Sequence, residues 1–147
     1  MAVVVAWIHY VVIMLMMATL LAEHLALKPT LTVTQARTLQ RLDIIYGVAA
    51  TLVLVTGIMR MYLEKGVTYY LQSGAFHALV GIFVLVAVLS IYPTVTFLRW
   101  RADTGAGRGQ ELAAAPYRNL QMIMRLEMAL VLLAPLFATW MAHGSFY

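Results

Sequence analysis

Residues 76–98 read FHALVGIFVLVAVLSIYPTVTFL, a run of 23 residues without a single Asp, Glu, Lys or Arg. A helix of about 20 apolar residues crosses the ~30 Å hydrocarbon core of a bilayer. Three further apolar runs occupy residues 2–26, 43–63 and 119–142. Because a spanning segment must satisfy its own backbone hydrogen bonds in lipid, each run predicts a helix. The fold class that we expect is all-α: an integral membrane protein built as an antiparallel four-helix transmembrane bundle.

The composition supports the membrane class and leaves room for one domain. Hydrophobic residues make up 63% of the chain and charged residues 11%, against roughly 25% charged residues in soluble domains. The length of 147 residues predicts a single four-span transmembrane domain over residues 1–147. The chain has no cysteine, which excludes disulfides and thiolate sites. The first run is longer than the roughly 7–15-residue core of a signal peptide, so we expect a retained helix.

The basic residues predict the orientation in the membrane. Seven of the ten lie in or beside the loops that follow the first and third runs: Lys28, Arg37, Arg41, Arg99, Arg101, Arg108 and Arg118. Arg60 and Lys65 lie on the other side, and Arg125 lies within the fourth run. By the positive-inside rule, the seven face the cytoplasm and both termini face outward. Because these residues flank a membrane, we do not interpret the net charge of +4 as a nucleic-acid signal.

Local patterns predict where the helices are interrupted. Pro29 stops the first helix, and Thr34 is a candidate N-cap for a short helix that continues into the second run. The glycine-rich residues 105–109 predict a mobile polar loop. Pro93 and Pro135 predict kinks within the third and fourth helices.

Ionisable side chains within the runs are candidate functional residues, because a charge at the bilayer centre costs about 2.5–3.5 kcal/mol on insertion scales. One set lies at comparable depth on the predicted cytoplasmic side: Glu23, His24, Asp43, Tyr46, Arg125 and Glu127. Arg125 lies about 12 Å along its helix from Tyr117, so we expect it to pair with Glu23 or Asp43. Two interpretations stay open: a polar network that fixes the helix register, and a proton relay or anionic-substrate site.

A second set of polar residues lies on the predicted outer side and comprises His9, Arg60, His77 and His143. Two histidines on different helices are what axial ligation of haem b requires, and a nearby arginine can pair with a propionate. We therefore predict His9 and His77 as ligands of the haem iron and Arg60 as the propionate partner. Their depths match if the third span begins near Tyr70. The alternative is that each histidine is a hydrogen-bonded residue of the membrane interface.

Ten methionines raise a third possibility, because thioethers select copper(I). Only Met14 with Met17, and Met124 with Met128, share a helix face. Methionine is also a common apolar filler of cores. Copper handling is therefore an alternative to the haem interpretation.

Short motifs along nearly the whole chain resemble those of a family of small bacterial four-helix membrane proteins. In chain order they are His9-Tyr10, Ala22-Glu23-His24-Leu25, Lys28-Pro29, Arg41-Leu42-Asp43-Ile44-Ile45-Tyr46-Gly47, Val55-Thr56-Gly57-Ile58-Met59-Arg60, Glu64-Lys65-Gly66, Tyr69-Tyr70, Leu89-Ser90-Ile91-Tyr92-Pro93-Thr94, Arg99-Trp100-Arg101 and Arg125-Leu126-Glu127. That family carries only a domain-of-unknown-function label. With the charge distribution, the resemblance implies a multi-pass protein of the bacterial inner (cytoplasmic) membrane with periplasmic termini.

The family is more distantly similar to CopD-type copper-resistance membrane proteins and to the bacterial membrane protoporphyrinogen IX oxidase. In that oxidase, a first-span His and a third-span His-x-Lys are associated with haem and activity. His9 and His77 match the two histidines, and the resemblance implies that they bind haem. The Lys position is Leu79 here, a departure that argues against oxidase-like chemistry and leaves both ligand positions in place.

Three functions are therefore expected, in this order. The first is a small polytopic inner-membrane protein that binds haem b or another tetrapyrrole through His9 and His77. The second is a non-catalytic accessory or structural subunit of a larger membrane complex, and the third is copper handling. The expected partners are the lipid bilayer and other membrane-protein subunits, and nucleic acid is not expected. The chain contains no hydrolase motif.

Overall fold

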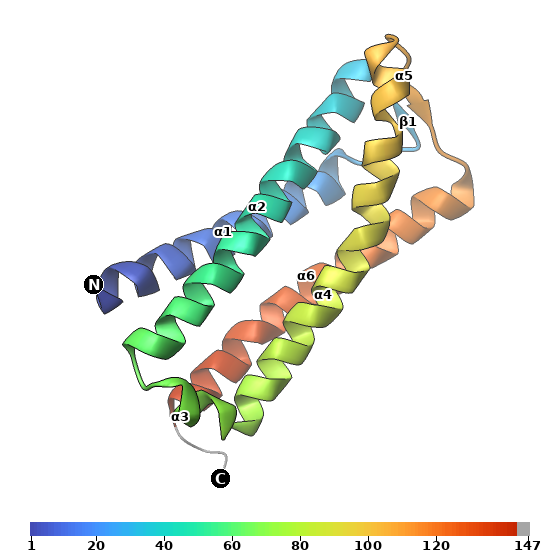
Figure 1. Ribbon diagram of the computed structural model, residues 1–147. Helices are drawn as coiled ribbons and strands as arrows, with labels where there is room; N and C mark the ends of the chain where they lie inside the picture. The colour runs from blue at the N-terminus through green and yellow to red at the C-terminus, as the bar shows by residue number, and fades with distance from the viewer. Residues whose placement is uncertain (144–147) are drawn as a thin grey trace.

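The computed structural model describes residues 1–143, and four long helices dominate it (Figure 1). The long helices are α1 (Ala2–Ala26), α2 (Val33–Leu63), α4 (Gly74–Arg99) and α6 (Ala114–Ala142). The shorter elements are β1 (Thr30–Leu31), α3 (Val67–Leu71), α5 (Arg101–Gly105) and β2 (Gln110–Glu111). Each long helix has the length and apolar composition to cross a membrane. The predicted all-α, four-span fold class is confirmed.

The four long helices form two hairpins that pack against each other. The N-terminal hairpin consists of α1 and α2, which share an extensive contact, and the C-terminal hairpin consists of α4 and α6. Contacts of α1 with α6 and of α2 with α4 join the hairpins along what we call the hairpin interface. The strand end of the bundle carries β1, β2 and α5, and the opposite end, the terminal end, carries α3 and the N-terminus (Figure 1).

The strand end is held together by contacts between segments far apart in the sequence. Strand β1 pairs antiparallel with β2, with Thr30 opposite Glu111. The guanidinium of Arg37 donates a hydrogen bond to the carbonyl of Thr104 at 2.8 Å. Gly109 lies so close to the β1 backbone that a Cβ there would collide with the carbonyl oxygen of Leu31. Part of the glycine-rich segment, expected to be mobile, is thus packed against the N-terminal hairpin.

The N-cap of helix α2 lies two residues before the predicted one. Thr32, and not Thr34, is the N-cap: its hydroxyl accepts from the backbone N–H of Gln35 at 3.3 Å, and the Gln35 side chain accepts from the backbone N–H of Thr32 at 3.0 Å. This reciprocal pair is a capping box, which satisfies two otherwise free donors of the first turn. The helix then runs without interruption to Leu63, so the expected short helix and the second span are one element.

The bundle has an apolar core and an apolar exterior. The core contains Met16, Leu20, Ala49, Val86 and Val131, all buried. Many large apolar side chains on the long helices are exposed, over far more of the surface than a water-soluble protein tolerates. This distribution is that of a bundle whose outer surface contacts lipid.

Candidate functional site

Three carboxylic side chains from three helices are buried inside the bundle within electrostatic range of one another, and we call them the carboxylate cluster. They are Glu23 of α1, Asp43 of α2 and Glu127 of α6, with side chains only 1%, 7% and 1% exposed. Glu23 lies within electrostatic range of both other groups, and Asp43 lies within range of Glu127. The structure thus brings together three residues that sequence reasoning placed at similar depth, together with Tyr46, which is also buried.

Two hydrogen bonds of the carboxylate cluster cross the hairpin interface. The hydroxyl of Thr94 on α4 donates to Oδ1 of Asp43 at 2.8 Å. The hydroxyl of Tyr46 on α2 donates to Oε1 of Glu127 on α6 at 3.3 Å. Each of these bonds therefore joins α2 to a helix of the C-terminal hairpin through a titratable side chain of the cluster.

Glu23 differs from the other two acids because one of its oxygens is fully buried without a hydrogen-bond partner among the described residues. Its Oε1 is buried and accepts no hydrogen bond from the described residues. The Nδ1 atom of His24, the next residue, is buried in the same way. Most buried polar atoms in proteins are hydrogen-bonded, and an exception marks a strained or functional group. The two exceptions here adjoin each other in sequence.

Among the described residues, no basic side chain forms an ion pair with the carboxylate cluster. Within residues 1–143, the two ion pairs between side chains are Arg60–Glu64 and Arg108–Asp103, both outside the cluster. Arg125 is exposed on α6, and the expected ion pair with Glu23 or Asp43 is not formed. The reason is rotational: Leu120, Met124, Glu127 and Val131 form the buried stripe of α6, and Arg125 lies off that stripe.

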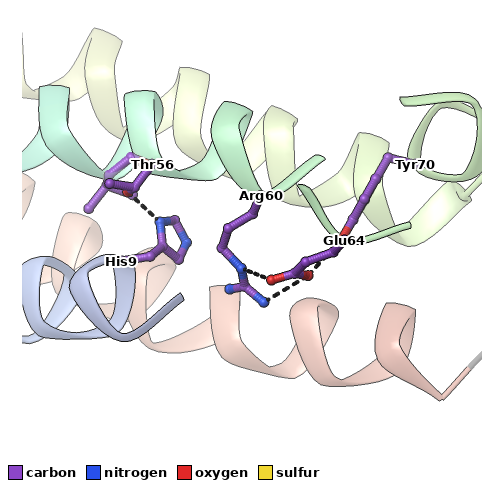
Figure 2. A network of polar contacts seen from close by, with 6 residues as sticks. His9, Thr56, Arg60, Glu64 and Tyr70 are labelled. Carbon is purple, nitrogen blue, oxygen red and sulfur yellow. Dashed lines mark hydrogen bonds and ion pairs between the residues drawn. The ribbon is translucent and has the colours of Figure 1, made fainter. Parts of the chain in front are cut away.

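A second polar group, the outer network, lies toward the terminal end and contains His9 and Arg60 (Figure 2). Nδ1 of His9 lies 2.8 Å from the hydroxyl oxygen of Thr56. Arg60 pairs with Glu64 through Nε at 2.6 Å and Nη2 at 3.2 Å, and its guanidinium lies 5.1 Å from the centre of the Tyr10 ring. Sequence reasoning anticipated His9 and Arg60 here and missed Thr56, Glu64 and Tyr10.

The hydrogen bonds of Thr56 determine where the proton of His9 lies. The Thr56 hydroxyl donates to the carbonyl of Leu52 at 2.6 Å, so it accepts from His9. The His9 proton is therefore on Nδ1, and Nε2 keeps a lone pair that can bind a metal or accept a hydrogen bond.

Glu64 links Arg60 to Tyr70 and lies just beyond the end of α2. The hydroxyl of Tyr70 donates to Oε2 of Glu64 at 3.1 Å. The hydrogen bond from Arg60 holds the pKa of Glu64 below its ordinary value, against burial, which acts in the opposite direction. Burial and the hydrogen bond to Glu64 raise the pKa of Tyr70 to about 12. At neutral pH, therefore, Glu64 is ionised and Tyr70 keeps its proton.

The other two histidines of the predicted outer set do not join this network. His77 is exposed on α4 with its Nδ1 2.9 Å from the carbonyl oxygen of Ser73. His143 makes the corresponding contact with Thr139 at 2.9 Å. Helices α1 and α4 are not among the pairs that share a substantial contact in the described part of the chain. Arg60, the predicted propionate partner, is paired with Glu64. The haem b assignment stays a prediction.

Metal binding by other side chains receives no support from the geometry. Residues 1–143 contain no group of three or more His, Asp or Glu side chains placed to hold a metal ion. Of the two methionine pairs, Met124 is fully buried in the core and Met14 is exposed. Copper handling therefore also stays a prediction.

The carboxylate cluster and the outer network are separate sites. Along α2, Tyr46 and Thr56 are ten residues apart, or about 15 Å. Buried apolar side chains fill the interval: Val12, Met16, Ala49, Val86 and Val131. Thr19 is the polar exception, and its hydroxyl bonds to carbonyls of its own helix at 3.0 Å. The described residues therefore form no continuous polar path across the bundle.

Comparison with known proteins identifies a family over almost the whole length. A family model described as "Predicted membrane protein (DUF2214)" matches residues 1–145. No curated protein and no solved structure matches the chain. The match agrees with the four-span fold and with the resemblance to an uncharacterised membrane family.

Proposed function

We propose that this chain, which belongs to the family of predicted membrane proteins DUF2214, binds protons within the membrane and couples their binding to the contact between its two hairpins. The observation that carries the proposal is the carboxylate cluster: three buried acids without a basic partner among the described residues. An ionised carboxylate at membrane depth costs about 2.5–3.5 kcal/mol. Binding a proton removes that charge, and a proton is the one cation that needs no cavity.

Proton release would change the hairpin interface in two opposing ways. Ionised Asp43 and Glu127 would accept stronger hydrogen bonds from Thr94 and Tyr46, since a charged acceptor roughly doubles such a bond. At the same time, ionised Glu23 would lie beside two like charges without a donor to its Oε1. The position of Glu23 on α1 makes it the residue that drives the hairpins apart when the cluster loses its protons.

Infrared difference spectroscopy tests the proposal on the protein reconstituted in lipid. The C=O stretch of a protonated carboxyl group is resolved from that of a carboxylate, so alkaline-minus-acidic spectra report each buried acid. We expect Glu127→Gln to remove one protonated-carboxyl band. Glu111→Gln makes the same chemical change at an exposed position of β2 and is expected to leave the protonated-carboxyl band of the buried acids at neutral pH unchanged. Absence of any protonated-carboxyl band in the wild-type protein would overturn the proposal.

Haem binding through His9 is a second candidate. The observation that favours it is a half-buried imidazole whose Nδ1 is held 2.8 Å from the Thr56 hydroxyl oxygen, which orients the ring. A bound haem would supply electron transfer or porphyrin chemistry. Visible spectra of the purified protein, oxidised and dithionite-reduced, are expected to show a Soret band that His9→Ala removes. A spectrum without a Soret band, from protein made in haem-replete cells, would contradict haem binding.

The proposed location is the inner membrane of a bacterium, with the strand end in the cytoplasm and both termini in the periplasm. Its support is the excess of Lys and Arg in the two loops of the strand end. A reporter fused to the C-terminus tests it: alkaline phosphatase is expected to be active there and green fluorescent protein dark.

A further inference from the structure

The carboxylate cluster lies between two ends of the bundle that differ in polarity. Toward the terminal end, the buried apolar side chains of all four long helices separate it from the outer network. Toward the strand end, Gln121 on α6 donates hydrogen bonds to the carbonyl of His24 at 3.5 Å and to the hydroxyl of Tyr117 at 3.3 Å. Among the described residues, polar contacts between helices therefore continue from the cluster toward the strand end, whereas Thr19, on the other side, bonds only within its own helix.

His24 is the titratable residue that leads away from the cluster on this side. It follows Glu23 directly on α1, and only two residues separate it from the end of that helix. Its ring is half-buried, and its Nδ1 is fully buried without a hydrogen-bond partner among the described residues. An imidazole with one buried nitrogen and a partly exposed ring can bind a proton at one nitrogen and release a proton from the other.

We infer that the carboxylate cluster exchanges protons with the strand end of the bundle through His24, and that the terminal end is closed to it. The inference rests on the proposed function. In each transfer, His24 takes a proton from the aqueous side, and the imidazolium releases its Nδ1 proton to a carboxylate of the cluster. The products are a neutral imidazole and a carboxylic acid, so charge and protons balance.

The charged and titratable groups that act on this step come from three helices. Arg125 of α6 acts electrostatically on His24. Asp43 of α2 and Glu127 of α6 act on Glu23, which is the acid nearest to His24 in sequence. The net charge of the cluster therefore depends on all three acids. The protonated-carboxyl band of one acid must for this reason be compared between the wild type and the variants.

The test is the rate at which the protonated carboxyl band exchanges in deuterated buffer. His24→Gln is expected to keep the band, because the cluster is intact, and to slow its exchange by about a hundredfold, the usual contribution of one positioned acid or base. His143→Gln is the same change at an exposed histidine of the terminal end, and its exchange is expected to match the wild type. Exchange in His24→Gln as fast as in the wild type would overturn the inference.

A second measurement uses the wild-type protein and does not depend on the folding of a variant. The pH is stepped on one side of vesicles whose protein orientation is known from proteolysis of the exposed 105–109 segment. The band is expected to respond when the stepped side faces the strand end. A response from the terminal end alone would refute the inference and keep the proposed function, whereas absence of the band refutes the proposed function itself.

Discussion

Replacing Tyr46 with phenylalanine tests whether the hydrogen bonds of the carboxylate cluster hold the two hairpins together. The Tyr46 hydroxyl is the donor to Oε1 of Glu127, and both side chains are buried, at 3% and 1% exposure. Tyr46→Phe removes one oxygen atom and keeps the ring in its packing. The change therefore isolates one contact across the hairpin interface.

The expected loss follows from burial of the acceptor. A buried acceptor left without its donor costs about 1–3 kcal/mol, whereas hydrogen bonds between membrane helices average about 0.6 and reach about 1.7 kcal/mol. The 3.3 Å length of this bond is long for a hydroxyl donor. We therefore expect Tyr46→Phe to lower the free energy of unfolding by about 1 kcal/mol, a roughly fivefold change in the unfolding equilibrium constant.

The assay is unfolding by sodium dodecyl sulfate from mild detergent, followed by circular dichroism. Tyr92→Phe makes the same chemical change on an exposed face of α4 and is expected to leave the midpoint unchanged. In a double-mutant cycle with Glu127→Leu, which deletes the acceptor, the two changes are expected to be non-additive, because either one abolishes the same bond. Additive losses, or a Tyr46→Phe midpoint equal to that of the wild type, would refute the reasoning.

Three further predictions concern the rest of the bundle. Glu64→Gln is expected to lower the free energy of unfolding by less than about 1 kcal/mol at neutral pH, because the ion pair with Arg60 is about one-quarter exposed. Since the pKa of Glu64 is lowered in the folded protein, the ion pair stabilises the fold above the unfolded-state pKa of Glu64, and this stabilisation disappears as the pH falls through the folded-state pKa. Unfolding titrations at a series of pH values will show this dependence. Gly109→Ala is expected to lower the thermal midpoint because its Cβ collides with a backbone carbonyl of β1, whereas Gly105→Ala, which has open space around the new Cβ, is expected to preserve it; equal midpoints would contradict the packing described. Arg125→Leu is expected to change the free energy of unfolding by less than about 0.5 kcal/mol, since Arg125 is exposed, and a large loss measured by detergent unfolding would mean that it holds a buried partner.

The sequence predicted the helices and much of the carboxylate cluster, because both depend on distance along the chain. Run length determines whether a helix spans the membrane, and depth from a helix end places Glu23, Asp43 and Glu127 at one level. The participation of Thr94 could not be predicted, because it depends on how α4 is rotated against α2. Threonine in an apolar run satisfies its hydroxyl within its own helix as readily as across an interface.

The predictions that were wrong or remain open depended on rotation and on pairing between distant segments. Arg125 was expected to pair because of its depth, but its direction is set by the buried stripe of α6, which the sequence shows only weakly. Likewise, His77 lies on the exposed side of α4. Its depth along the helix could not predict this direction, because depth does not determine which face of a helix a side chain occupies. The pairing of β1 with β2 involves two residues in each strand, too few for an alternating pattern to reveal.

The order of elements also has a consequence for biosynthesis. Helices α1 and α2 are consecutive and contact each other extensively, so the first hairpin is complete once Leu63 has left the ribosome. At that stage Glu23 and Asp43 can enter the bilayer, while Thr94 and Glu127 have not yet emerged from the ribosome. The newly inserted hairpin therefore exposes two acids to lipid until the second hairpin arrives. A nascent chain held at this point keeps both acids uncovered within the bilayer, and the time that they spend uncovered depends on how quickly α4 and α6 follow.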